Sequence, residues 1–329
     1  MSSPLASRRP PPGTAAGRAF RFLVIASLVS AVAQVTLGGV VRVTGSGLGC
    51  PDWPLCDGRV IPVYERTSII EFTHRMVASI LGLLTLSSAV LAWQYFRTEL
   101  RILVPCLAGA VLVLVAALLG AAVVLTELSW WVRLIHLGIA EGVVACFVVA
   151  AVVSSRSEAA SGVKARSEDR RLNILILASV VGVFALILSG SYMVGYGAGS
   201  SCATWPLCRG SLMPDGTAYA IHMGHRYLAA AIGLIVAAAA VAAWRRRASQ
   251  PALGQVALLI VALLGIQTMI GAATVWAEFS TETRAAHLGG ATLLWTAVVA
   301  LTTVCYVPRG LGLRTLASRP IAEPRGIGQ

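Results

Sequence analysis

Eight long apolar stretches dominate this sequence and restrict what the chain can fold into. An α-helix needs roughly 20 apolar residues to cross the hydrocarbon core of a bilayer, which is about 30 Å thick. With 57% hydrophobic and 12% charged residues, the composition excludes a disordered chain, a coiled coil and an ordinary water-soluble enzyme. Because backbone exposed to lipid must satisfy its own hydrogen bonds, each stretch is predicted to be a membrane-spanning helix. The stretches lie at 19–43, 72–96, 102–126, 131–154, 172–195, 222–244, 252–276 and 284–306.

The basic residues predict how these helices are oriented. The formal net charge is +12, and most Lys and Arg residues lie in the two tails and after the second, fourth and sixth stretches. With eight spans these segments share one side of the membrane, which the positive-inside rule assigns to the cytoplasm. Both termini are expected on that side, and the charge requires no nucleic-acid partner. A signal peptide over 18–33 is an alternative for the first stretch.

The sequence also contains an internal duplication. The loop from Cys50 to Cys56 matches the loop from Cys202 to Cys208 at an offset of 152, including a shared Trp-Pro-Leu. The matches at an offset of 151 are His74 with His225, His136 with His287, Arg133 with Arg284, Glu127 with Glu278, and Gly39 with Gly190. The duplication argues against a cleaved signal peptide, since cleavage would leave one half short.

Each repeat has four spans, an even number, so both repeats have the same orientation in the membrane. The predicted fold is an all-α membrane protein whose eight transmembrane helices form two tandem, parallel-related four-helix bundles. The predicted division is a disordered N-terminal tail at 1–17, a first bundle at 18–155, a cytoplasmic linker at 156–171, a second bundle at 172–307 and a C-terminal tail at 308–329.

Four of the 5 histidines fall at equivalent places near the outer ends of the spans. In a four-helix bundle, side chains of facing helices can meet in the core, and two opposed imidazoles can hold a haem iron. The duplication predicts two such pairs, His74 with His136 and His225 with His287. The alternative is that these residues only make hydrogen bonds between helices. A zinc site is less consistent with the pattern, because the cysteines lie at another depth.

One difference between the halves falls beside a predicted ligand. Glu71 precedes His74 by three residues, so the two side chains share a helical face, whereas His222 precedes His225. A carboxylate beside an iron ligand can move protons or orient a water molecule. The alternative is that Glu71 only interacts with the positive end of its helix.

Five arginines near the outer surface are candidates for contacts with haem propionates. Arginine suits carboxylates, although snorkelling to the membrane interface is an equal alternative. These residues are Arg42, Arg75, Arg133, Arg226 and Arg284. Arg42 has no basic counterpart, since the comparison at an offset of 151 pairs it with Met193.

The cysteines of the two outer loops predict two disulfides, Cys50–Cys56 and Cys202–Cys208. A disulfide persists outside the cytoplasm, and a proline-containing loop of this length lets the two sulfurs meet. For the first pair a redox role and a structural role are equally plausible, and for the second the structural role is favoured. The other cysteines are predicted to pack in the core: Cys106, Cys146 and Cys305.

Together these motifs resemble those of the Cys-containing class of bacterial haem A synthase. The resemblance rests on Glu71-Phe72-Thr73-His74-Arg75, on His225-Arg226, His136 and His287, and on the Cys pairs around Trp-Pro-Leu. It implies a cell-membrane oxidoreductase that converts haem O to haem A by successive hydroxylations of a porphyrin methyl group, which becomes a formyl group. The product would serve terminal oxidases, and a haem O synthase would be the upstream partner.

The resemblance also implies a role for each site residue. His74 and His136 would hold the substrate haem O, Glu71 would be the catalytic carboxylate, and His225 and His287 would hold a haem b cofactor. The Cys50–Cys56 bridge would lie near the substrate. No catalytic role is implied for His222.

Two other functions are compatible with paired histidines. One is a b-type cytochrome that transfers electrons through two unchanged haems, and the other is a haem transporter or delivery chaperone. The difference between Glu71 and His222 favours the enzyme, because two equivalent electron-transfer sites need no such asymmetry.

Overall fold

The computed structural model describes residues 14–62, 64–155 and 170–306. Each of the eight α-helices in these ranges is long and apolar enough to cross a membrane, so the chain is a multi-pass membrane protein. The predicted spans are confirmed, with α2 and α6 beginning several residues earlier than expected. The helices are α1 (Ala15–Val43), α2 (Arg66–Tyr95), α3 (Leu100–Leu125), α4 (Trp130–Ser155), α5 (Arg170–Gly195), α6 (Thr217–Trp244), α7 (Pro251–Trp276) and α8 (Thr281–Tyr306).

The predicted tails and linker fall mostly outside the described residues. Apart from Thr14, the described parts of these segments are helical, because α1 begins at Ala15, inside the predicted tail, and α5 at Arg170, inside the predicted linker. Thr14 explains the earlier start of α1, because its side chain accepts a hydrogen bond from the backbone N–H of Gly17 and so caps the helix.

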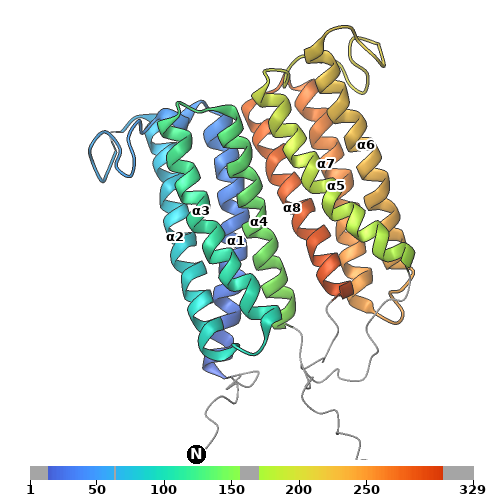
Figure 1. Ribbon diagram of the computed structural model, residues 1–329. Helices are drawn as coiled ribbons and strands as arrows, with labels where there is room; N and C mark the ends of the chain where they lie inside the picture. The colour runs from blue at the N-terminus through green and yellow to red at the C-terminus, as the bar shows by residue number, and fades with distance from the viewer. Residues whose placement is uncertain (1–13, 63, 156–169, 307–329) are drawn as a thin grey trace, which may run out of the picture.

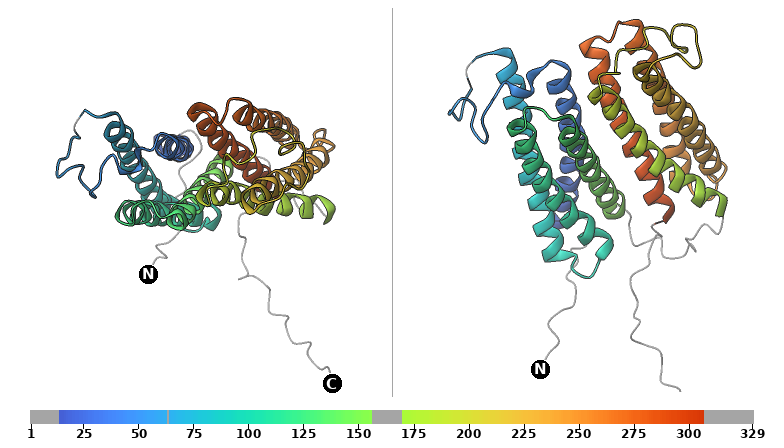
Figure 2. Two further views of the ribbon diagram at one scale, coloured as in Figure 1. Left: turned by 90° about the horizontal axis from the view of Figure 1, so that it is seen from above. Right: turned by 45° about the horizontal axis from the view of Figure 1, so that its top comes forward.

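The helices are arranged as two groups of four (Figure 1). Within each group every helix packs against the next, and the first helix of each group also packs against its fourth. The groups meet where α8 packs against α1 and α4, and where α4 packs against α5, as the view from above also shows (Figure 2). Both cysteine loops lie at the same end of the molecule (Figure 1). The arrangement therefore agrees with the predicted tandem bundles of common orientation.

The buried faces of the helices reveal the register of the duplication. In α1 the buried residues are Phe20, Val24, Ser27, Ala31, Val35 and Gly39. Each has a buried counterpart in α5 at an offset of 152: Leu172, Ile176, Ser179, Val183, Ile187 and Ser191. In the α3/α7 and α4/α8 pairs the buried positions repeat at 151 instead. Gly39 is thus equivalent to Ser191 rather than Gly190, and Arg42 to Val194 rather than Met193, which corrects the sequence comparison by one residue.

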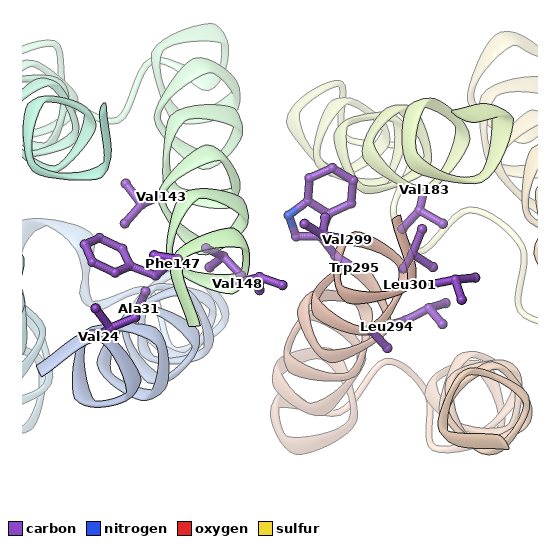
Figure 3. Close-up of a cluster of buried hydrophobic side chains, with 14 of the residues drawn as sticks. Val24, Ala31, Val143, Phe147, Val148, Val183, Leu294, Trp295, Val299 and Leu301 are labelled. Carbon is purple, nitrogen blue, oxygen red and sulfur yellow. The ribbon is translucent and has the colours of Figure 1, made fainter. Parts of the chain in front are cut away.

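One continuous apolar core runs through both bundles. Figure 3 shows Phe147 of α4 close to Val24 and Ala31 of α1, and Val183 of α5 close to α8. Between the bundles small residues let helices approach closely, since a Cβ on Gly39 would lie 2.8 Å from the Leu288 side chain. Cys106 is buried within α3, as predicted.

A polar contact joins the bundles inside this core. Glu141 of α4 is fully buried, and the Thr292 hydroxyl of α8 donates to its Oε1 over 2.7 Å. The Trp295 indole N–H donates to the Glu141 carbonyl over 3.0 Å. Glu141 and Thr292 occupy equivalent positions in the two repeats, so their contact lies on the axis that relates the repeats. Glu141 was not among the predicted site residues, although an acid within an apolar stretch is a recognisable signal.

Candidate functional site

The two cysteine loops are closed by the predicted disulfides, Cys50–Cys56 and Cys202–Cys208. A polar side chain organises each loop from within. The Asp52 carboxylate accepts hydrogen bonds from the backbone N–H groups of Asp57 and Gly58, at 2.6 and 2.8 Å. These bonds, chiefly that from Gly58, hold the pKa of Asp52 below its ordinary value. In the second loop Thr204 has this place, and its hydroxyl accepts from the N–H of Arg209 at 2.8 Å.

An arginine of the following helix fastens each loop to its bundle. The Arg75 guanidinium donates to the carbonyls of Cys50, Asp52 and Leu55 over 2.7–2.8 Å. Arg226 donates in the same way to the carbonyls of Cys202, Thr204 and Pro206. Arg75 and Arg226 were predicted to bind haem propionates because they lie next to histidines. In the structure their guanidinium groups bind backbone carbonyls instead.

The position that differs between the repeats lies directly beneath these loops. Glu71 is buried, and its Oε2 accepts from the N–H of Cys50 at 2.9 Å. Its Oε1 forms an ion pair with Arg75 Nη2 at 2.6 Å. His222 is also buried and contacts the Ala198 carbonyl and Arg226, at 3.0 and 3.3 Å. The carboxylate thus touches both the disulfide loop and its arginine, while the second repeat has an imidazole ring in its place.

The four predicted ligands lie on helices that bring them near one another in two pairs. His74 of α2 interacts electrostatically with His136 of α4, and His225 of α6 with His287 of α8. Within the described ranges no cluster of three or more His, Cys, Asp or Glu side chains is arranged to hold a bare metal ion. A structural zinc ion needs four ligands, whereas a porphyrin supplies four of its own and needs only two from the protein. Two facing imidazoles therefore fit porphyrin iron better than a bare metal.

Each of these rings packs against a glycine of the preceding helix. A Cβ on Gly38, Gly190 or Gly271 would lie only 3.1–3.2 Å from Cε1 of His74, His225 or His287, respectively. The fourth glycine, Gly120, leaves slightly more room, with 3.6 Å to Cε1 of His136. The bundles thus provide a cradle beside each imidazole that any larger residue would narrow.

The hydrogen bonds behind the rings differ between the halves. In the second half Nδ1 of each ring has a side-chain partner: Ser189 Oγ lies 2.8 Å from His225, and the Gln267 amide lies 3.2 Å from His287. In the first half the Nδ1 atoms of His74 and His136 are buried without a partner, and the Gln34 amide lies 3.2 Å from Nε2 of His74 instead. Partners at Nδ1 orient a ring so that Nε2 faces a metal. The sequence analysis missed Ser189 and Gln267, although a glutamine in an apolar span was a visible signal.

The remaining predicted arginines lie between the bundles. Arg42 Nη2 donates to the Ser191 carbonyl of α5 over 3.3 Å, and Arg133 Nε is buried without a partner. Arg133 and Arg284 both interact electrostatically with Arg42. The structure therefore separates the five candidate arginines into two that hold loops and three that gather at the junction.

These features define a class: a multi-pass membrane protein built from two equivalent four-helix bundles, each with a pair of histidines on its second and fourth helices. The sequence matches the model of the COX15-CtaA family, described as cytochrome oxidase assembly protein, over residues 21–68, 63–299 and 216–322. The chain belongs to this family.

Relatives with curated names support the same assignment. A protein named Heme A synthase from Symbiobacterium thermophilum is 30% identical over 312 residues, which cover 91% of this chain and 99% of the relative. A protein of the same name from Geobacillus kaustophilus is 27% identical over 273 residues, which cover 82% of this chain and 86% of the relative.

Proposed function

We propose that this protein is a haem A synthase, an oxidoreductase that converts the methyl group of haem O to the formyl group of haem A. The observation that carries the proposal is the pair of equivalent bundles, each with two facing histidines, of which only one has a carboxylate beside its ligand. The names of the relatives support the reaction. A haem O synthase would supply the substrate from the same membrane, and both termini would face the cytoplasm.

The two bundles would have different tasks. The first would bind the substrate haem through His74 and His136, and the second would hold haem b through His225 and His287. The contacts of Ser189 and Gln267 support this division, because rings oriented in advance suit a permanently bound cofactor.

The chemistry would combine the bound iron with the side chains around Glu71. When bound, the iron porphyrin would supply the redox chemistry of the methyl oxidation, and the electrons would pass on to an external acceptor. Glu71 would accept a proton that this oxidation releases, which requires the carboxylate to loosen its contact with Arg75. Because Cys50 donates its N–H to Glu71, the disulfide loop fixes where that carboxylate lies.

Replacement of Glu71 by Gln tests the proposal. The amide keeps the size of the side chain but cannot accept a proton at neutral pH, and removal of a general base typically slows a reaction about 10²–10⁴-fold. In a host that makes haem O, the variant should retain bound haem and accumulate haem O, measured by extraction and chromatography of the pigments. Glu65→Gln is the matched control, because Glu65 precedes the same helix and its side chain makes no capping bond.

Other outcomes would favour other functions. Undiminished haem A production by the Glu71 variant would contradict the catalytic role. A wild-type protein that binds two haems but leaves haem O unchanged would indicate an electron-transfer cytochrome instead.

A further inference from the structure

Three arginines meet at the outer junction of the bundles. Arg42 is the penultimate residue of α1, while Arg133 and Arg284 lie in the first turns of α4 and α8. Since α1 packs against both α4 and α8, these helix ends come together at the side of the cysteine loops. All three side chains are half-buried, and Arg133 and Arg284 each act electrostatically on Arg42.

The cluster has no counter-charge of its own. Among the described residues no carboxylate lies within ion-pair distance of the three guanidinium groups, whereas Arg75 pairs with Glu71. Arg133 Nε is buried without a partner, and the 3.3 Å bond from Arg42 to the Ser191 carbonyl is long. Like charges repel more strongly where water is scarce, and unpaired buried donors are costly. A bound anion would relieve both effects.

The position of the cluster indicates which anion it suits. Arg133 and Arg284 precede His136 and His287 by three residues, so each lies on the same helical face as a predicted ligand, one turn further out. A porphyrin held by these histidines would meet the cluster with its outward substituents. The carboxylates of haem are its propionates, and the planar guanidinium group binds a carboxylate through two parallel hydrogen bonds.

We propose that Arg42, Arg133 and Arg284 form one carboxylate site between the bundles that is shared by the propionates of both bound haems. The proposal rests on the proposed function. It reduces the five candidate arginines to three, because the guanidinium groups of Arg75 and Arg226 hold the loops. α8 contributes Arg284 and α1 contributes Arg42, so each bundle supplies part of the site.

Comparison of haem with its dimethyl ester tests the site. Both porphyrins carry the same iron, but the ester has no propionate charge. Full-length protein in detergent should bind haem at least about tenfold more tightly than the ester, as expected for one charge-assisted hydrogen bond. In R133Q/R284Q this preference should fall to about twofold, while R133K/R284K should keep part of it, because lysine retains the charge without the fork.

The controls separate the site from general effects of charge and folding. R97Q removes an arginine that follows α2 at the opposite end of the bundles, and it should keep the wild-type preference. Gel filtration and thermal stability show that each variant is folded. The preference for haem over the ester is also measured in H74A/H136A and in H225A/H287A. Each of these double variants retains one of the two histidine pairs.

The outcomes distinguish this site from the function on which it rests. A preference in both single-pair proteins supports a shared site, and a preference confined to one of them overturns the sharing. Equal binding of haem and ester by the wild type, or full preference in R133Q/R284Q, overturns the site alone. Failure of the wild type to bind either porphyrin overturns the haem function and the site together.

Discussion

At the scale of single residues, the repeats show how identical side chains can conceal a difference in chemistry. Arg75 holds its disulfide loop through three backbone carbonyls, and Arg226 holds the other loop through four. Their next contact differs, because Arg75 pairs with the carboxylate of Glu71 and Arg226 with the ring of His222. The difference between Glu71 and His222 was visible in the sequence. The shared role of the two arginines in holding the loops was not visible, because a hydrogen bond to a backbone carbonyl does not depend on which side chain the acceptor residue carries.

The Asp52 carboxylate makes the first loop sensitive to pH. Its pKa is held below the ordinary 3.8 in the folded loop, so its stabilising contribution is complete above that value and is lost as the pH falls through the lower folded pKa. We expect reduction of Cys50–Cys56 by a phosphine to accelerate, relative to Cys202–Cys208, as the pH is lowered to about 3. Mass spectrometry after alkylation measures both rates in one sample.

The second loop is the internal control for this prediction. Thr204 does not titrate, so the reduction of Cys202–Cys208 should show no matching change. Asp52→Asn should remove the difference in pH dependence between the loops. Parallel acceleration in both loops would show that the bundle, rather than Asp52, responds to acid.

At the scale of helices, the duplication uses glycine to place its histidines. Each predicted ligand packs against a glycine of the helix before it, and this arrangement recurs in both repeats. The buried faces show that Gly190 is equivalent to Gly38, which the sequence comparison missed because it applied one offset to the whole first helix. The offset changes between Pro62 and the start of α2, where the first repeat has one residue more than the second.

Substitution of these glycines by alanine distinguishes an effect on helix stability from an effect on the position of the histidine rings. Alanine favours a helix over glycine by about 1 kcal/mol, but a Cβ at Gly190 or Gly271 lies 3.2 Å from a histidine ring and must displace it. We expect Gly190→Ala and Gly271→Ala to lower haem content several-fold without loss of folded protein, measured by the pyridine haemochrome spectrum.

Gly120→Ala is the matched variant in the first bundle. Its Cβ would lie 3.6 Å from the His136 ring, an ordinary contact distance, so haem binding there should change little. Equal losses in all three variants would mean that the glycines serve helix packing rather than the rings.

At the scale of the whole molecule, the repeats are joined by residues that were once equivalent. Glu141 and Thr292 occupy the same position in the two halves and bond to each other across the axis between them. The first repeat provides the carboxylate and the second repeat provides the hydroxyl donor. Two identical repeats could not form this contact, because both would have the same side chain at this position. The second carboxylate oxygen, Oε2, is buried without a partner, so the contact with Thr292 matters for stability.

Thr292→Val should therefore destabilise the protein. Valine preserves the shape of threonine but removes the donor to Glu141, and a buried acceptor that loses its partner costs about 1–3 kcal/mol. Thermal unfolding in detergent should show a lower midpoint for this variant. Thr268→Val on α7 is the control, since the Thr268 hydroxyl bonds only to the Leu264 carbonyl of its own helix. An unchanged midpoint in Thr292→Val would contradict a stabilising role for the pair.

The sequence by itself determined the eight spans, the duplication and the disulfide pairs, and it predicted two pairs of histidines. These features depend on local properties, because apolar length, repeated rare residues and cysteine spacing are all readable along one dimension. Only the tertiary structure decided which arginines hold loops, which three meet between the bundles, and that Glu141 faces Thr292. Those contacts join residues far apart in the chain, and they depend on how helices rotate and approach one another, which small residues such as Gly39 permit.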